Sequence, residues 1–509
     1  MAEVTPATIA PAVAREGKGL AGNSVGLFGA IVIGVSCVAP AYTLTAALGP
    51  IVSVVGVHTP AILLIGFLPM LLVAMGYREL NRAVPDNGTS FAWATLAFGP
   101  YVGWLAGWGL VASTVLVLSN SAGIAVDFFY LMLAQAFSSP SIASLSADKY
   151  INVATCLAFM GGAAFISYRG MHTTKVVQYL LVGLQIIVMT GFGITALTKA
   201  QAGLAFDFTP IQMDWFNPLT VTSTGAIAAG LSLSIFIFWG WDVTLTMNEE
   251  TEDAARNPGL AAALTVGVTM LLYVLASVAS ITFAGIGTAG IGMGNADVQR
   301  NVFLALAPAV FGPASIAMAV AVLCSSAASL QSTMVSPSRT LLAMSHYGAM
   351  PKQFAQISAR YRTPHVGIFA SSIVSSVFYA VMRFISEHVL WDTITALGIM
   401  ICFYYSITAL SVVWYFRNSW FSSLSAFLNR LLMPLVGGIV LGALFFRTLS
   451  DSLDPDFGSG SHVGGIGLVF VIGMAIFGLG LLVMLAVLLK NPSFFRHGAA
   501  LIRAGQDRP

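Results

Sequence analysis

A helix that crosses the hydrocarbon core of a bilayer needs about 20 consecutive apolar residues, and this sequence repeats such stretches along its whole length. The composition agrees, because 57% of its 509 residues are hydrophobic and only 8% are charged, against about 25% charged residues in soluble domains. The chain is therefore predicted to be an all-α integral membrane protein. The twelve predicted spans lie near 24–50, 59–80, 100–133, 151–168, 176–198, 222–248, 259–286, 313–345, 365–385, 391–416, 427–447 and 463–489.

Lysine and arginine residues are distributed unequally between the segments that connect these spans. If the N-terminus is cytoplasmic, the outer segments hold only Lys149, Lys199, Arg300, Arg383 and Arg447 of the 22 basic residues. This bias obeys the rule that cytoplasmic segments carry the excess of positive charge. We therefore expect a multi-pass protein of the cell (inner, or cytoplasmic) membrane, with both termini cytoplasmic and an even number of spans.

Net charge and cysteine usage argue against several other classes of protein. The formal net charge is +2, which gives no basic field for nucleic acid. The cysteines (Cys37, Cys156, Cys324 and Cys402) all lie inside apolar stretches, with neither a disulfide pattern nor metal-ligand spacing. We expect no cofactor and no metal. An enzyme is not expected because the intramembrane residues show no catalytic spacing, and the few ionisable groups do not form the polar stripe of a channel.

The stretch Leu231–Pro258 contains an interrupted apolar span. Gly240 lies between Trp239 and Trp241, and Asp242 follows at once. An ionisable residue inside a span is costly and marks a functional site by default. A glycine beside it indicates a helix that is broken so that backbone groups face a cavity. A kinked span whose acid reaches a headgroup or a neighbouring helix is the other interpretation.

The first span is interrupted at a corresponding position. Within Gly34–Pro40, Pro40 has no N–H to donate to the carbonyl of Ser36, and it disfavours helix in the turn before it. Two breaks, near Ser36–Pro40 and Phe238–Asp242, are typical of an inverted repeat with a site at the membrane midplane. Ordinary kinks are the alternative. The expected parts are a cytoplasmic N-terminal tail (1–22), transmembrane helices 1–5 (23–200), helices 6–10 (220–417), helices 11–12 (427–490) and a cytoplasmic C-terminal tail (491–509).

Three motifs, in order along the chain, resemble those of amino acid–polyamine–organocation (APC) transporters. FIFWGWDVTLTMNEETEDAARNPG is similar to the sixth-span motif of that family. Residues 73–108 resemble its second-to-third-span motif, and SSAASLQSTMVSPSRTLLAMSHYGAMP resembles the end of its eighth span. The residues that carry the second and third motifs are Glu79, Leu80, Pro85, Gly88, Gly99, Gly103, Gly107, Trp108, Ser338, Arg339, Gly348 and Pro351.

The resemblance implies a five-plus-five inverted repeat of the leucine-transporter type, with discontinuous helices 1 and 6, alternating access and small amines or amino acids as cargo. Two departures from the family matter. The Gly-small-Gly tripeptide of the first break aligns either with Gly34–Ser36 or with Ala39–Ala41. The lysine that some proton-coupled relatives carry in span five is replaced by Gln185, which cannot titrate.

Cargo is expected to bind between the two breaks. A cargo carboxylate would lie at the start of the outer half of span one, where the helix dipole and free N–H groups favour an anion. An amine would face carbonyls freed in span six, with Asp242 as counter-charge, unless that acid only joins helices. The aromatic side chains of spans one, six and ten, including Tyr405, would form a box that binds cations and excludes water. Alternatively, some of them would face lipid. The candidate cargo-binding residues are Ser36, Cys37, Val38, Ala39, Tyr42, Phe236, Phe238, Trp239, Gly240, Trp241, Asp242, Phe403 and Tyr404.

Transport is expected to be coupled to a proton or to sodium. Asp242 is the acid best placed to exchange a proton, because burial disfavours its charged form, and Gln185 occupies the family's lysine position. Ser325, Ser326 and Ser329 fall where sodium-coupled relatives of this fold place hydroxyl ligands, and hydroxyl oxygens suit a hard cation. Hydroxyl residues that only join helices are the alternative.

Charged residues at the cytoplasmic ends of the spans are expected to form an inner gate. Glu79, Glu249 and Glu250 would pair with arginines when that gate is closed. The candidate arginines are Arg78, Arg82, Arg256 and Arg339. Asp127, late in span three, is expected to reach water, and His346 and His365 are expected to be solvated loop residues.

These observations favour a secondary active permease that moves small amino acids or amines, by proton-coupled symport or exchange. A carrier of a non-amine cargo (a cation or a carboxylate) and a sodium-coupled symporter remain alternatives. The expected partners are a small-molecule cargo, the lipid bilayer and the coupling ion, with no nucleic acid. The protein is expected to be a monomer or a homodimer.

Overall fold

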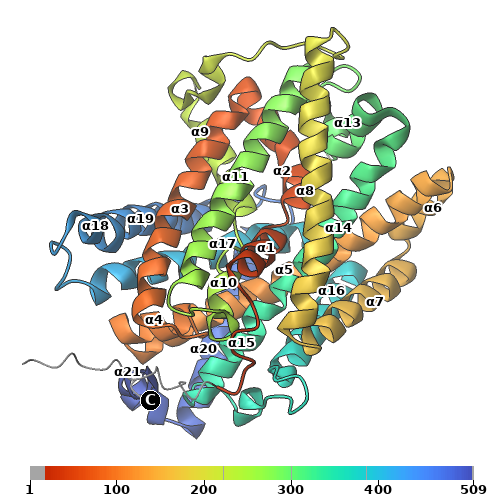
Figure 1. Cartoon of the computed structure of the whole chain (residues 1–509). Helices are drawn as coiled ribbons and strands as arrows, with labels where there is room; N and C mark the ends of the chain where they lie inside the picture. Colours follow the sequence, from red (N-terminus) through yellow and green to blue (C-terminus); the bar gives the residue numbers. More distant parts are fainter. Residues whose placement is uncertain (1–17, 222, 300, 386, 507–509) are drawn as a thin grey trace, which may run out of the picture.

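The computed structural model describes residues 18–506 except positions 222, 300 and 386, and these residues fold almost entirely into helices (Figure 1). Residues 1–17 of the predicted N-terminal tail and residues 507–509 of the predicted C-terminal tail lie outside the described residues. One antiparallel pair of short strands joins β1 (His462–Val463) to β2 (Ile466–Gly467).

The longer helices are α3 (Thr59–Ala83), α5 (Pro100–Ala136), α7 (Lys149–Tyr168), α8 (Met171–Gln201), α11 (Asn257–Ala284), α14 (Ile316–Thr333), α16 (His365–Ile385), α17 (Glu387–Tyr415), α19 (Met433–Asp451) and α20 (Leu468–Lys490). The shorter helices are α1 (Leu27–Val38), α2 (Pro40–Val55), α4 (Ser90–Phe98), α6 (Pro140–Ala143), α9 (Thr224–Ile237), α10 (Val243–Thr246), α12 (Ala296–Gln299), α13 (Val302–Phe311), α15 (Val335–His346), α18 (Leu424–Ala426) and α21 (Ser493–Gln506). Single turns of tighter or wider helix are η1 (Gly56–His58), η2 (Ser144–Ala147), η3 (Met213–Phe216), η4 (Pro218–Thr220), η5 (Asn248–Glu250), η6 (Gly312–Ser315), η7 (Lys352–Ala355) and η8 (Phe427–Leu432).

Ten helical stretches of the described residues are long and apolar enough to cross a membrane. The first two predicted spans fall together in the stretch Leu27–Ala83, and the predicted eighth span lies within Val302–His346. The predicted sixth span is in none of the ten, since its longest helix, α9, has only 14 residues. A helical, multi-pass membrane protein is therefore confirmed, and the number of twelve spans stays a prediction.

The predicted break in the first span lies between α1 and α2. Ala39 separates the two helices and adopts a left-handed conformation with φ 56° and ψ 60°. Pro40 begins α2, a position where its missing N–H would have no partner in any case. A left-handed residue other than glycine costs roughly 1–3 kcal/mol, so the packing around the fully buried Ala39 must hold it. The break falls within Ala39–Ala41 and not within Gly34–Ser36.

The predicted break in the sixth span separates α9 from α10. The residues Phe238–Asp242 between them form turns, and Gly240 has φ 109°, a region that favours glycine. A Cβ atom on Gly240 would lie 3.1 Å from both the carbonyl carbon and the sulfur of Cys37. The two breaks are therefore in direct contact, and a side chain at position 240 would separate them.

The broken helices lie inside the bundle and the unbroken helices surround them. In Figure 1, α1 occupies the middle of the view, with α8 and α11 beside it. α1 packs against α8, α11 and α14, and α2 packs against α9 and α14. α5 and α17 pack against each other, and α19 and α20 pack on α17. This packing brings α1, α2, α5, α9, α14 and α17 to one place.

Candidate functional site

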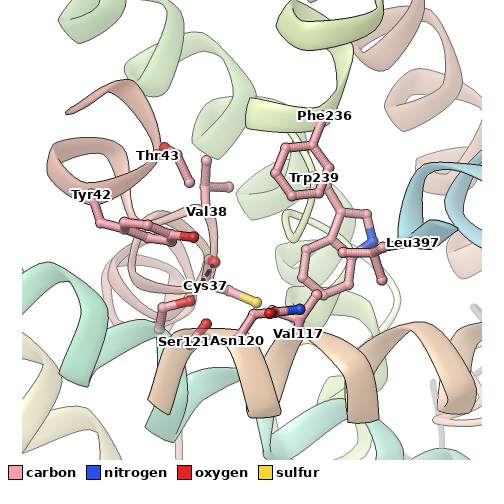
Figure 2. A pocket seen from close by; sticks show the side chains of 11 residues that line it. Cys37, Val38, Tyr42, Thr43, Val117, Asn120, Ser121, Phe236, Trp239 and Leu397 are labelled. Atoms are coloured by element: carbon pink, nitrogen blue, oxygen red, sulfur yellow. Dashed lines mark hydrogen bonds between the residues drawn. The ribbon is translucent and has the colours of Figure 1, made fainter. Parts of the chain in front are cut away.

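A small cavity lies where the two breaks meet (Figure 2). Its volume is about 30 Å³. One water molecule needs a cavity of roughly 10–15 Å³, so this cavity admits only groups about the size of water. A larger cargo requires the helices to separate. The lining residues are Cys37, Val38, Tyr42, Thr43, Val117, Asn120, Ser121, Phe236, Trp239, Ser329 and Leu397.

The structure brings part of the predicted cargo site together around this cavity. The predicted residues that line it are Cys37, Val38, Tyr42, Phe236, Trp239 and the coupling candidate Ser329. The predicted cargo residues outside the lining are Ser36, Ala39, Phe238, Gly240, Trp241, Asp242, Phe403 and Tyr404. Ala39 and Gly240 nevertheless shape the cavity, because their left-handed backbones form the two breaks.

Sequence reasoning missed the wall that α5 contributes, which consists of Val117, Asn120 and Ser121. It also missed Thr43 on α2 and Leu397 on α17. A signal was available for α5, since Asn120 and Ser121 are polar residues inside an apolar helix of 37 residues, and polar side chains within a span mark function.

The hydroxyl groups of α14 tie that helix to the first break. Ser329 donates to the carbonyl of Cys37 at 3.1 Å, and Ser325 accepts from the amide of Tyr42 at 3.2 Å. Ser326 instead donates to carbonyls of its own helix. Ser36 of α1 donates to the carbonyl of Ala328 at 3.3 Å. These bonds join helices, which is one of the two roles expected for the serines.

Asp242 is buried behind the cavity wall and is held by two tyrosines of α17. Tyr404 and Tyr405 donate to its two carboxylate oxygens at 3.1 and 3.0 Å. Trp239, which lines the cavity, donates from its indole N–H to the Tyr404 hydroxyl at 2.7 Å. The ring of Trp241 stacks on Tyr405 at 5.1 Å. The acid is therefore connected to the cavity through Trp239 and Tyr404 and does not line it.

Gln185 on α8 is fully buried, and its amide makes no hydrogen bond to any described residue. Gln178, two turns earlier, donates to the carbonyl of Ala328 at 3.0 Å and also bonds to Gln331. Ser36 donates to the same carbonyl. Neutral polar groups therefore join α8, α14 and α1 two turns before Gln185.

One end of the bundle is closed by a buried ion pair between Glu250 of η5 and Arg339 of α15. Nε and Nη2 of the guanidinium donate to the two carboxylate oxygens at 2.7 and 3.0 Å. Both side chains are only 1% exposed. The backbone carbonyl of Glu250 also accepts from the amide of Ser24 at 2.8 Å. This pairing of Glu250 with Arg339 is one of those expected for the inner gate.

A second ionic cluster at the same end involves residues that sequence reasoning did not single out. The ammonium group of Lys18 lies 3.0 Å from Asp86 and also pairs with Glu249. The hydroxyl of Tyr347 donates to Asp86 at 2.6 Å, and the amide of Gly88 donates to it at 2.8 Å. Glu249 therefore pairs with a lysine, and not with one of the expected arginines.

Glu79 pairs with Arg82 at 2.8 Å, one turn along the same helix, and with Arg430 at 3.0 Å. Arg430 was not among the expected partners. Asp127 is exposed. His346 is exposed as well, but it is the last residue of helix α15 and not the loop residue that was expected. His365 is partly buried at the start of α16, so it is not a solvated loop residue.

The charge of the Lys18–Asp86 cluster is expected to persist across the physiological pH range. Burial would raise the pKa of Asp86, but Lys18 and the hydrogen bonds from Tyr347 and Gly88 outweigh burial and lower it from 3.8. Burial would lower the pKa of Lys18, but its two carboxylates outweigh burial and raise it from 10.5. A lowered carboxyl pKa gives stability that is lost only as the pH falls through it, and a raised lysine pKa gives stability that is lost only as the pH rises through it.

The stability difference between the parent and Asp86→Asn should therefore be constant from about pH 5 to 9 and shrink only below about pH 4. Thermal unfolding of both proteins over this range measures it. A difference that changes between pH 6 and 8 would show that this cluster titrates during the working range.

Comparison with known proteins identifies relatives of this chain. The profile of a family described as amino acid permease matches residues 25–451. A branched-chain amino acid permease of Lactococcus lactis, BcaP, is 24% identical over 321 residues, which are 61% of this chain and 66% of that permease. The chain thus spans slightly less than two thirds of that relative's length. An uncharacterized transporter of Mycobacterium tuberculosis is 25% identical over 346 residues, 67% of this chain and 70% of that transporter.

The structural comparison is consistent with these relatives. The crystal structure of MhsT in complex with L-phenylalanine superposes with a TM-score of 0.59, covering 83% of this chain and 98% of MhsT at 16% identity. At that identity the likeness shows a shared fold and nothing more. The family profile covers most of the chain, including both breaks and the cavity, and the sequence relatives are transporters and not enzymes. The chain belongs to the amino acid permease family of the APC superfamily.

Proposed function

We propose that this protein is a secondary active transporter that moves amino acids across the cytoplasmic membrane by alternating access. The observation that carries the proposal is the small cavity at the meeting point of two broken helices, within a bundle whose charged end is closed. A cavity of this size fits a state in which the cargo path is shut. Separation of the helices toward one side and then the other would expose the site alternately.

The proposed architecture has twelve spans. Two consecutive helices that together cross the membrane, such as α1 with α2, count as one span. The first five and the next five form inverted halves, and each half begins with a broken helix whose break faces the other. The last two spans lie outside the repeat, where they serve as scaffold or as a dimer surface. The twelve spans are α1 with α2, α3, α5, α7, α8, α9 with α10, α11, α14 with α15, α16, α17, α19 and α20.

The proposed orientation places the end with the Glu250–Arg339 pair and the Lys18 cluster in the cytoplasm, together with both termini. The asymmetry of lysine and arginine supports it. The same two clusters then form the inner gate, and they would have to separate before cargo leaves toward the cytoplasm. Lys18, Asp86 and Tyr347 join the gate residues expected from the sequence.

The cavity favours a cargo without net charge. None of its lining residues is Asp, Glu, Lys, Arg or His, so a lone cation or carboxylate would be desolvated without a counter-charge. A zwitterionic amino acid brings both charges itself. The N-terminus of α2, where the helix dipole favours an anion, would lie nearest the carboxylate. Val38, Val117, Phe236 and Leu397 offer apolar contact for a side chain. The branched-chain permease among the relatives agrees with this choice.

A thermal-shift panel on the purified protein tests the cargo class. The panel contains the twenty L-amino acids, polyamines, monoamines, carboxylates and alkali cations. A ligand at a hundred times its Kd stabilises the folded state by about 2.7 kcal/mol, so the bound class should stand out. Saturable uptake of the stabilising compound into proteoliposomes should follow. Stabilisation by carboxylates or cations alone would favour the alternative cargo, and unsaturable flux would indicate a channel.

Coupling to a proton through Asp242 is proposed on the basis of its burial, which disfavours the charged form, and of its connection to the cavity through Tyr404 and Trp239. We expect Asp242→Asn to lose the dependence of uptake on external pH and to lose proton-driven accumulation, since the amide cannot exchange a proton. Tyr405→Phe is the matched control, because it removes one hydrogen bond to Asp242 and keeps the titrating carboxyl. Uptake is measured against pH for the three proteins, with and without sodium.

Two outcomes of this experiment would contradict the proposal. If Asp242→Asn keeps full transport and the parent's pH profile, Asp242 only holds helices together and does not exchange the coupling proton. A steep requirement for sodium in the parent would move the coupling site to Ser325 and Ser329, whose oxygens lie against the first break.

A further inference from the structure

The wall of the cavity on α5 carries polar groups whose hydrogen-bonding capacity is unused. Asn120 is only 6% exposed; its amide nitrogen donates to the carbonyl of Leu116 at 3.1 Å, whereas its Oδ1 has no partner among the described residues. Ser121 is 1% exposed, and its hydroxyl makes no hydrogen bond to any described residue. Ser119 faces away from the cavity on the same turn and is paired, since its hydroxyl bonds to the carbonyls of Val115 and Ser375.

The unused groups face the space between the two breaks. Figure 2 shows Asn120 and Ser121 rising from α5 toward Cys37, with the hydroxyl of Tyr42 directed at the same space. A buried acceptor without a donor is unfavourable, so such groups in native proteins call for a partner. Here the partner has to come from whatever occupies the cavity.

The carbonyls at the end of α9, which were expected to receive an amine, each already accept one hydrogen bond. Those of Ile235 and Phe236 accept from the amides of Phe238 and Trp239 at 3.2 and 3.1 Å. That of Ile237 accepts from the hydroxyl of Tyr273 at 2.7 Å. Asp242 is likewise held by its tyrosines and lies outside the lining. The wall on α5 is therefore better placed to receive new donors.

We propose that Oδ1 of Asn120, together with the hydroxyl of Ser121, accepts hydrogen bonds from the ammonium group of the cargo. The inference rests on the proposed function, because it requires an amino acid as cargo. An ammonium group carries three donors and no acceptor, which matches two oxygens to which no described group donates a hydrogen bond. These oxygens are neutral, so the cargo's own carboxylate must balance the ammonium. Asn120 thereby selects zwitterions and excludes simple amines.

Two substitutions of Asn120 test this role in opposite directions. Asn120→Leu removes the acceptor at similar volume and should weaken binding of the best-bound L-amino acid of the panel about ten- to a hundredfold, the range for a hydrogen bond to a charged group. Its deaminated analogue, the carboxylic acid without the α-amino group, should bind the parent only weakly, because its carboxylate has no counter-charge, and Asn120→Leu should not weaken that binding further. Asn120→Asp adds a charge in the same shape and should create binding of the decarboxylated amine, which then finds its counter-charge in the protein.

Binding is measured by thermal shift and calorimetry on the full-length protein, so the result does not depend on turnover. Ser119→Ala is the matched control on the same turn, since it removes a buried hydroxyl that is paired outside the cavity, and it should leave affinities unchanged. If the parent binds no amino acid of the panel, the proposed function fails and the inference with it. Suppose instead that the parent binds an amino acid, but Asn120→Leu leaves its affinity unchanged or lowers the affinities for the amino acid and the deaminated analogue equally. Only the role of Asn120 is then overturned. The role is likewise overturned if Asn120→Asp gains no affinity for the amine.

Discussion

Replacing Gly240 with leucine is expected to abolish uptake while the protein stays folded. Gly240 has φ 109°, where an L-residue is strained by roughly 1–3 kcal/mol. Because glycine has no Cβ, Cys37 can also lie directly against Gly240. A Cβ at this position would lie 3.1 Å from the carbonyl carbon and from the sulfur of Cys37. A leucine side chain would push the two breaks apart and deform the cavity between them. Uptake into proteoliposomes measures the loss, and thermal unfolding and gel filtration verify folding.

Gly191→Leu on α8 is the matched control for this substitution. It adds the same side chain within a membrane helix, at a position where a new Cβ would meet no atom within 4 Å, so uptake should be unchanged. Gly240→Ala should give an intermediate loss, because it shares the strained backbone but adds less volume. Normal transport by Gly240→Leu would mean that close contact of the two breaks is not needed for the transport cycle.

Removing one partner of the Glu250–Arg339 pair is expected to destabilise the protein strongly. Both side chains are 1% exposed, and a buried charge left without its partner costs roughly 3–5 kcal/mol. Glu250→Gln and Arg339→Met should each lower stability by about this amount and impair closure of the charged end. The double variant, which leaves no unpaired charge, should recover part of the loss. Thermal unfolding of the four proteins gives the coupling energy of the pair.

The pair of Arg447 with Asp451 provides the comparison for this experiment. Its distance of 2.8 Å is close to the 2.7 Å of the buried pair, but its side chains are 71% and 36% exposed. Exposed pairs contribute little because water screens them. Arg447→Gln should therefore leave stability nearly unchanged. Additive losses in the Glu250 and Arg339 variants, with no recovery in the double variant, would show that the two side chains do not act as a pair.

Features that depend on neighbouring residues along the chain were predictable from the sequence. The lengths of the apolar stretches predicted the helices that cross the membrane. Both breaks were predictable because their causes are local: Pro40 lacks an N–H, and Gly240 tolerates a left-handed backbone beside Trp239 and Trp241. The motifs also pointed to Glu250 and Arg339 as gate residues, and the structure joins them.

Features that depend on contacts between distant segments were not predictable in this way. Lys18 meets Asp86 and Glu249 across 68 and 231 positions, and no periodicity in an apolar sequence encodes such pairs. The hydrogen-bond partners of Asp242 come from α17. They hold the acid behind the cavity wall, although the sequence had suggested it as a cargo ligand. Sequence reasoning cannot supply this distinction because it depends on the rotation of one helix against another.

The sequence by itself determined that this chain is a helical membrane protein of the amino acid permease family with two interrupted helices, because apolar length, backbone chemistry and motif order are properties of consecutive residues. Only the tertiary structure decided which side chains surround the space between the breaks. Every apolar helix of similar length offers several faces of nearly equal hydrophobicity, and the packing of α5 against α14 and α17 selects the face that carries Asn120 and Ser121.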